Sequence, residues 1–360
     1  MEEGFTSSEL KKEYRSYTKR KIAFILICAI VAFASVGLSA SVGGRTIEFF
    51  QVYSVILDHL LGKPLEQGTV EWMDDYVIWN IRLPRAIFAA VAGSGLAVAG
   101  VAMQSVMKNP LADPYTTGVS SGACFGVSIA MILGFTAFNQ GGQIGLIINA
   151  FVFALIPMAL IAVISPMSRS SPATLILAGV ALSYLFNAFN TLLMITTDSE
   201  TLAEVYRWQV GSFTNMTWSN VYLMVTVTIL GIIGILLMSR QLNLMSLGDD
   251  HAKSLGLDVN TIRIICLVIM SLMVASVIAF AGIIGFVGLI SPHIVRMVID
   301  SDNKFVIPAA AAFGAAFLMS ADVISRLLSD INAVPVGVVV SFIGAPIFLY
   351  LIIKQRNKLW

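Results

Sequence analysis

Charged residues are scarce in this chain. Only 12% of its 360 residues are Asp, Glu, Lys or Arg, whereas 57% are hydrophobic. A soluble domain carries roughly 25% charged residues, so the composition indicates an integral membrane protein instead. Cysteine is scarce too, because Cys28, Cys124 and Cys266 are the three in the chain and each lies inside an apolar run. Their spacing excludes a disulfide framework and a cysteine metal site, and we expect them to pack in the core.

Ionisable residues are missing from the middle of the long apolar runs, and Asp113, His293 and Asp322 all lie near the ends of runs. Ion-coupled transporters need such groups near the membrane midplane, and channels with a charged filter need them in the pore. The sequence therefore gives no support for either class. His293 has no second ligand at helical spacing, so no metal site is predicted. No cluster of residues with catalytic spacing is present either, so no catalytic residues are predicted.

A nucleotide-binding motif is also absent. The nearest lookalike, residues 248–254, lacks the second glycine of the phosphate-binding loop. It carries Asp249 and Asp250 where phosphates would lie. Energy for active transport therefore has to come from a partner protein.

Long apolar runs, in contrast, are abundant, and a bilayer core requires about 20 apolar residues per helix. Such runs cover residues 22–44, 86–107, 114–168, 170–197, 218–239, 264–295, 305–321 and 331–353. The third run is too long for one span and breaks near residues 139–142, and the sixth is interrupted by Gly282, Gly285 and Gly288. We therefore predict an all-α integral membrane protein with about ten transmembrane helices.

The distribution of basic residues predicts the topology. A polar tail, residues 1–21, precedes a single transmembrane domain, residues 22–360, and the apolar run 22–44 exceeds the roughly 7–15 residues of a signal peptide. With ten alternating spans, sixteen of the 22 Lys and Arg residues fall on the side of the tail. The positive-inside rule then puts both termini in the cytoplasm, with residues 45–81 as a long polar loop on the outer side.

Residues 86–107 are unusually rich in Ala, Gly and Ser. Small side chains let helices approach closely in a membrane, where packing drives association. We predict that this run is a central helix of the bundle.

The polar stretch 247–259 is expected to be cytoplasmic. Its helical pattern ends at Gly256, a residue suited to a C-terminal cap. It is the best candidate for a partner-binding segment, and the alternative is an ordinary solvated turn.

Several motifs, in order along the chain, together resemble one transporter family. They are Arg82-Leu83-Pro84-Arg85, Asn109-Pro110-Leu111-Ala112-Asp113-Pro114, Gly118-Val119-Ser120-Ser121-Gly122, Leu177-Ala178-Gly179-Val180, Trp208 with Gly211-Ser212, Leu247-Gly248 with Ser254-Leu255-Gly256, residues 285–296, Ala321-Asp322 with Arg326, Pro335-Val336-Gly337 and Gly344-Ala345-Pro346. With these motifs the chain resembles the permease family of ABC importers for iron-siderophores, cobalamin and haem. One departure is Ala333, where the family usually has Glu; another is the less polar Ser171-Pro172-Ala173.

The resemblance implies a non-enzymatic, multi-pass permease of the cytoplasmic membrane, without a cofactor. It implies a homodimer with the translocation path at its interface, surrounded by lipid. The expected partners are cytoplasmic ATP-binding subunits and an extracytoplasmic substrate-binding protein, with no nucleic acid. The implied site residues are Arg82, Arg85 and Arg326 for docking of the binding protein, Asn109 and Leu111 for a cytoplasmic gate, and Leu247, Gly248, Ala252, Ser254, Leu255 and Gly256 for coupling to the ATPase.

Alternatives stay open at this point. Arg82 and Arg85 could be interfacial anchors, and Arg326 could pair with Asp322 one helical turn away. A substrate-gated channel or a secondary transporter without an ATPase is the competing function. The substrate itself, whether iron-siderophore, cobalamin, haem or an oxyanion, is not determined by the sequence.

Overall fold

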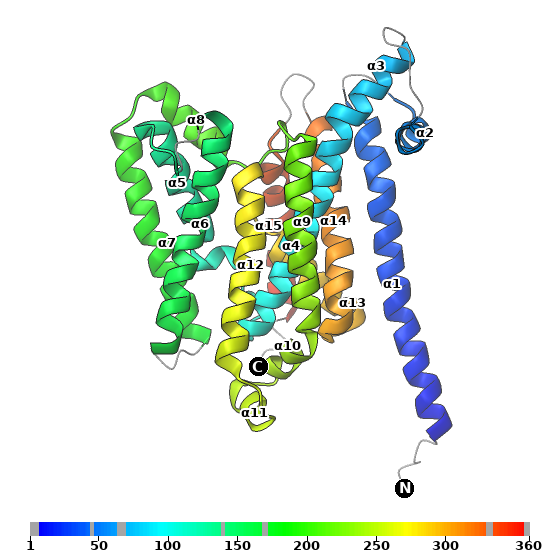
Figure 1. Ribbon diagram of the computed structural model, residues 1–360. Helices are drawn as coiled ribbons and strands as arrows, with labels where there is room; N and C mark the ends of the chain where they lie inside the picture. The colour runs from blue at the N-terminus through cyan, green and yellow to red at the C-terminus, as the bar shows by residue number, and fades with distance from the viewer. Residues whose placement is uncertain are drawn as a thin grey trace.

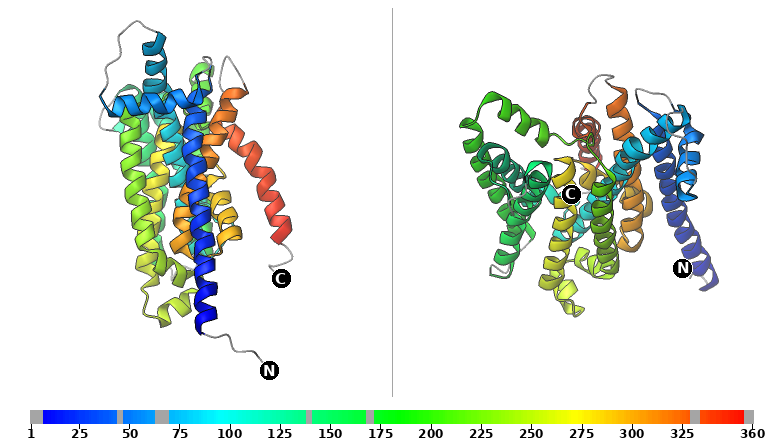
Figure 2. Two further views of the ribbon diagram at one scale, coloured as in Figure 1. Left: turned by 90° about the vertical axis from the view of Figure 1, so that its right-hand side faces the viewer. Right: turned by 45° about the horizontal axis from the view of Figure 1, so that its top comes forward.

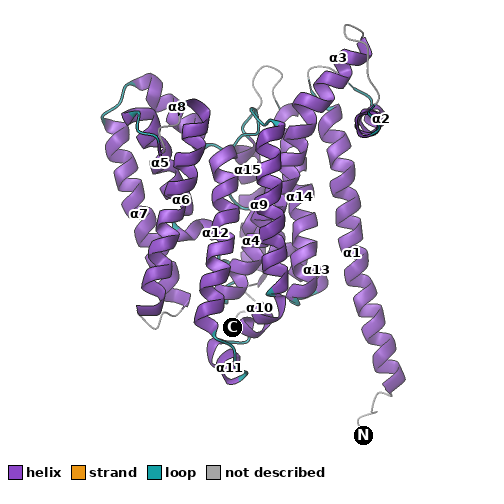
Figure 3. Cartoon of the chain, in the orientation of Figure 1, coloured by secondary structure: helices purple, strands orange, loops and turns teal. Residues whose placement is uncertain are grey.

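The computed structural model describes residues 7–43, 47–62, 70–137, 141–167, 172–328 and 334–355. Helices make up nearly all of this part of the chain, which contains no strand (Figure 1; Figure 3). Eight helices are long and apolar enough to cross a membrane, and two shorter apolar helices, Val119–Leu133 and Val287–Ile299, accompany them. The predicted all-α fold of about ten membrane helices is confirmed.

The ten membrane helices follow the predicted order. They are α1 (Ser7–Ser41), α4 (Leu83–Met107), α5 (Val119–Leu133), α6 (Gly142–Met167), α7 (Pro172–Ile195), α9 (Trp218–Leu237), α12 (Val259–Ala281), α13 (Val287–Ile299), α14 (Asn303–Leu327) and α15 (Val336–Gln355). The short connecting helices are α2 (Phe49–Leu60), α3 (Val70–Tyr76), η1 (Val77–Arg82), η2 (Pro114–Thr117), α8 (Ser199–Gln209), α10 (Ser239–Ser246) and α11 (Asp249–Ser254).

The stretch predicted as a polar loop, residues 45–81, is largely helical where it is described. The helix α2 buries Val52 and Val55 while Phe50 and Leu60 stay exposed, so it is amphipathic. Its charge-free stretch is too short to span a membrane, so the sequence pattern does not predict this helix.

The bundle has two distinct ends (Figure 1; Figure 2). The helices α10 and α11 lie at one end, which we call the α11 end, and α1 begins there. The helices α2, α3 and α8 lie at the other, which we call the α3 end. Seen from the side, α5 to α8 form one group and the remaining membrane helices form a second group around α4 (Figure 1).

The central position predicted for residues 86–107 is confirmed, because most of α4 is buried. Two glycine contacts set its distance from its neighbours. A Cβ on Gly93 would lie 2.2 Å from the carbonyl oxygen of Gly314 in α14, and one on Gly100 would lie 1.7 Å from that of Gly288 in α13. Only glycine permits such contact between backbones.

Candidate functional site

The three arginines singled out by the sequence lie together at the α3 end of the bundle, around Asp322. Arg85 Nε donates to Asp322 Oδ1 at 3.0 Å and Oδ2 at 3.2 Å, and its Nη2 lies 2.7 Å from Oδ1. Arg326, one turn further along α14, places Nη2 3.2 Å from Oδ2. The carboxylate of Asp322 is completely buried. We call Arg82, Arg85, Asp322 and Arg326 the Asp322 cluster.

The cluster also holds the end of α1. Arg82 Nη1 donates to the carbonyl oxygens of Ala40 at 2.8 Å and Ser41 at 3.0 Å. Arg326 Nη1 donates to the carbonyl oxygen of Val42 at 2.9 Å. These carbonyls lie at or just beyond the C-terminal turn of α1, where backbone acceptors lack helical partners. The cluster thus joins α1, α4 and α14.

The alternative pairing of Arg326 with Asp322 is what the structure shows, and Arg85 makes a second pairing that the sequence analysis did not predict. The side chains of Arg85 and Arg326 are 14% and 10% exposed. Their guanidinium groups are thus occupied inside the chain, so any external partner would have to share them with Asp322.

The segment expected to be helical and capped at Gly256 forms α11. Gly256 N–H donates to the carbonyl oxygen of Lys253 at 2.9 Å, and Leu257 N–H donates to that of Ala252 at 3.0 Å. With Gly256 at φ +83°, this is the Schellman cap typical of a helix ended by glycine. Ala252 is fully buried and fixes the helix to the bundle.

Two leucines stand out from this segment. Leu247 is 65% exposed and Leu255 is 63% exposed, and they flank α11. Ser254 donates to the carbonyl oxygen of His251 at 2.8 Å, and Gly248 adopts φ +118°. The helix α11 therefore protrudes from the bundle (Figure 1), and the exposed leucines before and after it give this protrusion an apolar surface.

Asp249, the first residue of α11, makes two ion pairs. Its carboxylate lies 3.0 Å from Lys108 Nζ and 2.8 Å from Arg263 Nη2. Burial raises the pKa of this carboxyl, but the hydrogen bonds and charges of Arg263 and Lys108 outweigh burial, and the pKa lies below the ordinary 3.8. The carboxylate is therefore charged at neutral pH.

The predicted gate residues lie in the turn that follows α4, also at the α11 end. Asn109 Oδ1 accepts a hydrogen bond from Leu111 N–H at 2.9 Å, which is an Asx turn. The carbonyl oxygen of Asn109 accepts from Ala112 N–H at 3.0 Å. Leu111 is 41% exposed, so the turn presents an apolar side chain on a fixed backbone.

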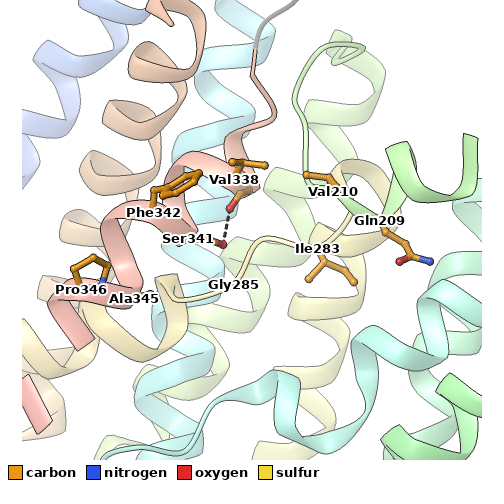
Figure 4. Close-up of a pocket in the computed structure, with 10 residues that line it drawn as sticks. Gln209, Val210, Ile283, Gly285, Val338, Ser341, Phe342, Ala345 and Pro346 are labelled. Carbon is orange, nitrogen blue, oxygen red and sulfur yellow. Dashed lines mark hydrogen bonds between the residues drawn. The ribbon is translucent and has the colours of Figure 1, made fainter. Parts of the chain in front are cut away.

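A cavity of about 760 Å³ lies against one face of α15 (Figure 4). Its lining residues come from the end of α8, from the connection between α12 and α13, and from α15; they are Gln209, Val210, Ile283, Gly285, Gly337, Val338, Ser341, Phe342, Ala345 and Pro346. Most are apolar, and Ser341 directs its hydroxyl to the carbonyl oxygen of Gly337 at 2.8 Å. Phe342 is 77% exposed.

Backbone hydrogen bonds hold the walls of the cavity together. Gly211 N–H donates to Ile283 at 3.1 Å, and Gly337 N–H donates to Gly211 at 3.0 Å. A Cβ on Gly211 would lie 2.5 Å from the Ile283 carbonyl oxygen, so close approach requires glycine there. Sequence reasoning did not identify these lining residues; the motif glycines Gly211, Gly285 and Gly337 were the signal that could have found them.

A protein-family model described as the FecCD transport family matches residues 27–354. An ABC transporter permease protein of Methanocaldococcus jannaschii is 38% identical over 97% of this chain and 99% of its own length. The hemin transport system permease protein of Yersinia pestis is 37% identical, covering 78% of this chain and 84% of its own length. The vitamin B12 import system permease protein of Vibrio cholerae is 35% identical, covering 79% and 85%.

A solved structure is also similar. It is a metal-chelate type ABC transporter in an inward-facing conformation, with a TM-score of 0.79 and 30% sequence identity. The match covers 92% of this chain and 98% of that chain. The sequence comparisons and the structural comparison therefore point to the same transporter family over nearly the whole length of the chain.

Proposed function

Because the chain belongs to the FecCD transport family and is a permease of the metal-chelate type ABC importers, we propose that two copies of it form the membrane pathway of an ATP-driven importer. The observation that carries this proposal is the 760 Å³ apolar cavity on the exposed face of α15. A cavity open on one side of a subunit becomes a closed path when a second copy covers it.

The cargo in this proposal is a metal chelate of the iron-siderophore, cobalamin or haem class. Relatives of the chain are named as permeases for hemin, iron(3+)-hydroxamate and vitamin B12. The cavity offers few polar groups, Gln209 and Ser341 among its lining residues. Such a wall suits a bulky chelate whose polar contacts are made mainly by a binding protein.

ATP-binding subunits would dock on the α11 end, which the positive-inside rule assigns to the cytoplasm together with both termini. Leu247 and Leu255 provide the apolar contact, while Gly248, Ala252, Ser254 and Gly256 fix the shape of the protrusion. Asn109 and Leu111 would narrow the path at the same end.

The extracytoplasmic binding protein would dock at the α3 end. Arginine suits carboxylates of a partner because its planar fork donates several hydrogen bonds. In this chain Arg82, Arg85 and Arg326 already bind internal acceptors, so we propose that docking uses their remaining donors and their surplus positive charge over Asp322.

Cysteine crosslinking tests the dimer that this proposal needs. Phe342→Cys in a variant lacking the three native cysteines should crosslink to a second copy in native membranes, because Phe342 lies on the α15 face beside the cavity. Tyr184→Cys is a matched control, since Tyr184 is 74% exposed on α7, away from the cavity lining. Crosslinking at position 184 but not at 342 would contradict a path closed at α15.

A further inference from the structure

One carboxylate joins three helices at the α11 end. Asp249 begins α11, Lys108 ends α4 at its C-cap, and Arg263 lies in the first turns of α12. The three side chains meet within 3.0 Å. Neither the family match nor the proposed function assigns a role to this triad.

The two cations that bind Asp249 differ in how deeply they are buried. The side chain of Arg263 is 1% exposed, and a charge buried to that extent is strongly destabilising when its partner is removed. Its pair with Asp249 therefore braces α11 against α12. Lys108 is 28% exposed and reaches Asp249 on a flexible stem, so this second pair joins α11 to α4 without being needed for the brace.

Lys108 is held where it can act on the gate. It adopts the left-handed conformation at φ +50°, which is uncommon for a residue with a side chain. The next residue, Asn109, sends its N–H to the carbonyl oxygen of Gln104 at 3.1 Å. The turn containing Asn109 and Leu111 thus follows directly from the residue that Asp249 holds.

Asp249, the acidic member of the pair, adjoins the segment that we propose contacts the ATPase. Asp249 follows Gly248 and the exposed Leu247, and the capped helix α11 carries Leu255 at its end. Because α11 is short and capped, displacement of Leu255, which directly follows its last residue, would move the helix as a unit. The Lys108–Asp249 pair is a direct side-chain link between the contact proposed for the ATPase and the gate proposed at Asn109 and Leu111.

The helix α4 extends this link across the bundle. It has 25 residues, which corresponds to roughly 37 Å at 1.5 Å per residue. One end is held by Asp249 through Lys108, and the other by Asp322 through Arg85. A displacement of α4 at the Lys108 end would therefore also strain the Arg85–Asp322 pair at its other end.

We propose that the Lys108–Asp249 ion pair is the positioning contact that passes displacement of α11 to the gate turn after α4. Both residues act through the gate and do not touch the cargo. The inference rests on the proposed function, since it requires that α11 bind an ATPase. It adds a specific residue pair whose loss uncouples ATP hydrolysis from transport.

The test uses Lys108→Ala in the full complex with ATP-binding subunits and binding protein, reconstituted in liposomes. Lys108 is chosen over Asp249 because removing the carboxylate would leave Arg263 buried without its anion. Lys108→Arg is the conservative variant, and Lys304→Ala, which removes an exposed lysine at the start of α14, outside the proposed ATPase contact, is the matched control. The readouts are chelate imported per ATP hydrolysed, basal ATPase rate and heat resistance of the complex.

We expect Lys108→Ala to keep its ATPase subunits and basal hydrolysis but to import at least about fivefold less chelate per ATP, the lower bound of ordinary coupling energies. Lys108→Arg should restore most of the ratio of chelate imported to ATP hydrolysed, and Lys304→Ala should leave this ratio unchanged. An unchanged ratio in Lys108→Ala would overturn the inference. So would a loss that tracks reduced heat resistance and is not restored by arginine, since the pair would then be a brace only.

The proposed function fails separately, in the wild-type chain. If the wild-type permease does not bind an ATPase, or imports without ATP, the function is wrong irrespective of Lys108. If wild type imports normally and only the Lys108 series behaves as a brace, the function stands and the positioning role falls.

Discussion

Arg85→Ala is the substitution whose effect the structure determines most closely. It removes three hydrogen bonds from the Asp322 carboxylate, at 2.7 to 3.2 Å. The carboxylate itself stays completely buried. Arg326 still lies 3.2 Å from it, so the anion is not left wholly unpaired.

The magnitude follows from that geometry. Breaking a buried ion pair by removing one partner costs roughly 3–5 kcal/mol. Because Arg326 persists, we expect a loss near the lower limit, about 3 kcal/mol. Arg85→Lys should be more stable than Arg85→Ala but less stable than wild type, because an ammonium group is a point donor and cannot reproduce the planar fork of arginine.

The assay is heat treatment of the detergent-solubilised permease, followed by size-exclusion chromatography of the monodisperse fraction. Arg207→Ala is the matched control, because Arg207 lies at the same end on α8 and is exposed. Arg85→Ala should lose its monodisperse peak at clearly lower temperature than Arg207→Ala. Equal heat resistance in the two variants would refute the structural role of the Asp322 cluster.

Four further predictions concern packing, docking and pH. Gly100→Ala should cost about 1–3 kcal/mol by overpacking, measured by heat resistance, whereas Gly285→Ala, where a Cβ would meet nothing within 4 Å, should be neutral. Leu255→Asp should abolish co-purification of the ATPase subunits while the permease still inserts in the membrane. Arg82→Gln should lower the affinity of the permease for the binding protein about tenfold, or 1.4 kcal/mol, in a titration at low salt. The loss of affinity should be smaller at high salt. Because the pKa of Asp249 is lowered, its ion pair with Lys108 contributes fully above the ordinary carboxyl pKa and is lost only as pH falls through the lowered one. The ratio of import per ATP in wild type to that in Lys108→Ala should therefore be constant from neutral pH to about 5, and a fall of this ratio within that range would contradict the assignment.

Much of the fold follows from the sequence, because membrane helices must be long and apolar and their breaks carry glycines or polar residues. The division of residues 264–295 at Gly282 is an example, since α12 ends at Ala281 and Gly282 adopts φ +76°. The small residues of α4 predicted its central position, because small side chains let neighbouring helices approach closely. The helix α2 was not predicted, because its charge-free stretch, residues 49–57, is too short to span a membrane.

The pairings within the site could not be predicted. Asp322 and Arg326 are one turn apart, so their contact was foreseeable, but Arg85 lies 237 residues from Asp322. The link from Lys108 to Asp249 likewise depends on how α4 and α11 pack. The cavity at α15 arises from three separated segments, and only the tertiary structure brings them together.

The most direct test of the account is uptake by the reconstituted complex. Liposomes containing the permease, with its ATP-binding subunits and ATP inside and its binding protein loaded with a ferric siderophore, cobalamin or haem outside, should accumulate at least one of these chelates. Accumulation should stop when ATP is replaced by a non-hydrolysable analogue. Uptake that continues without ATP hydrolysis would contradict the account and favour a channel or a secondary transporter.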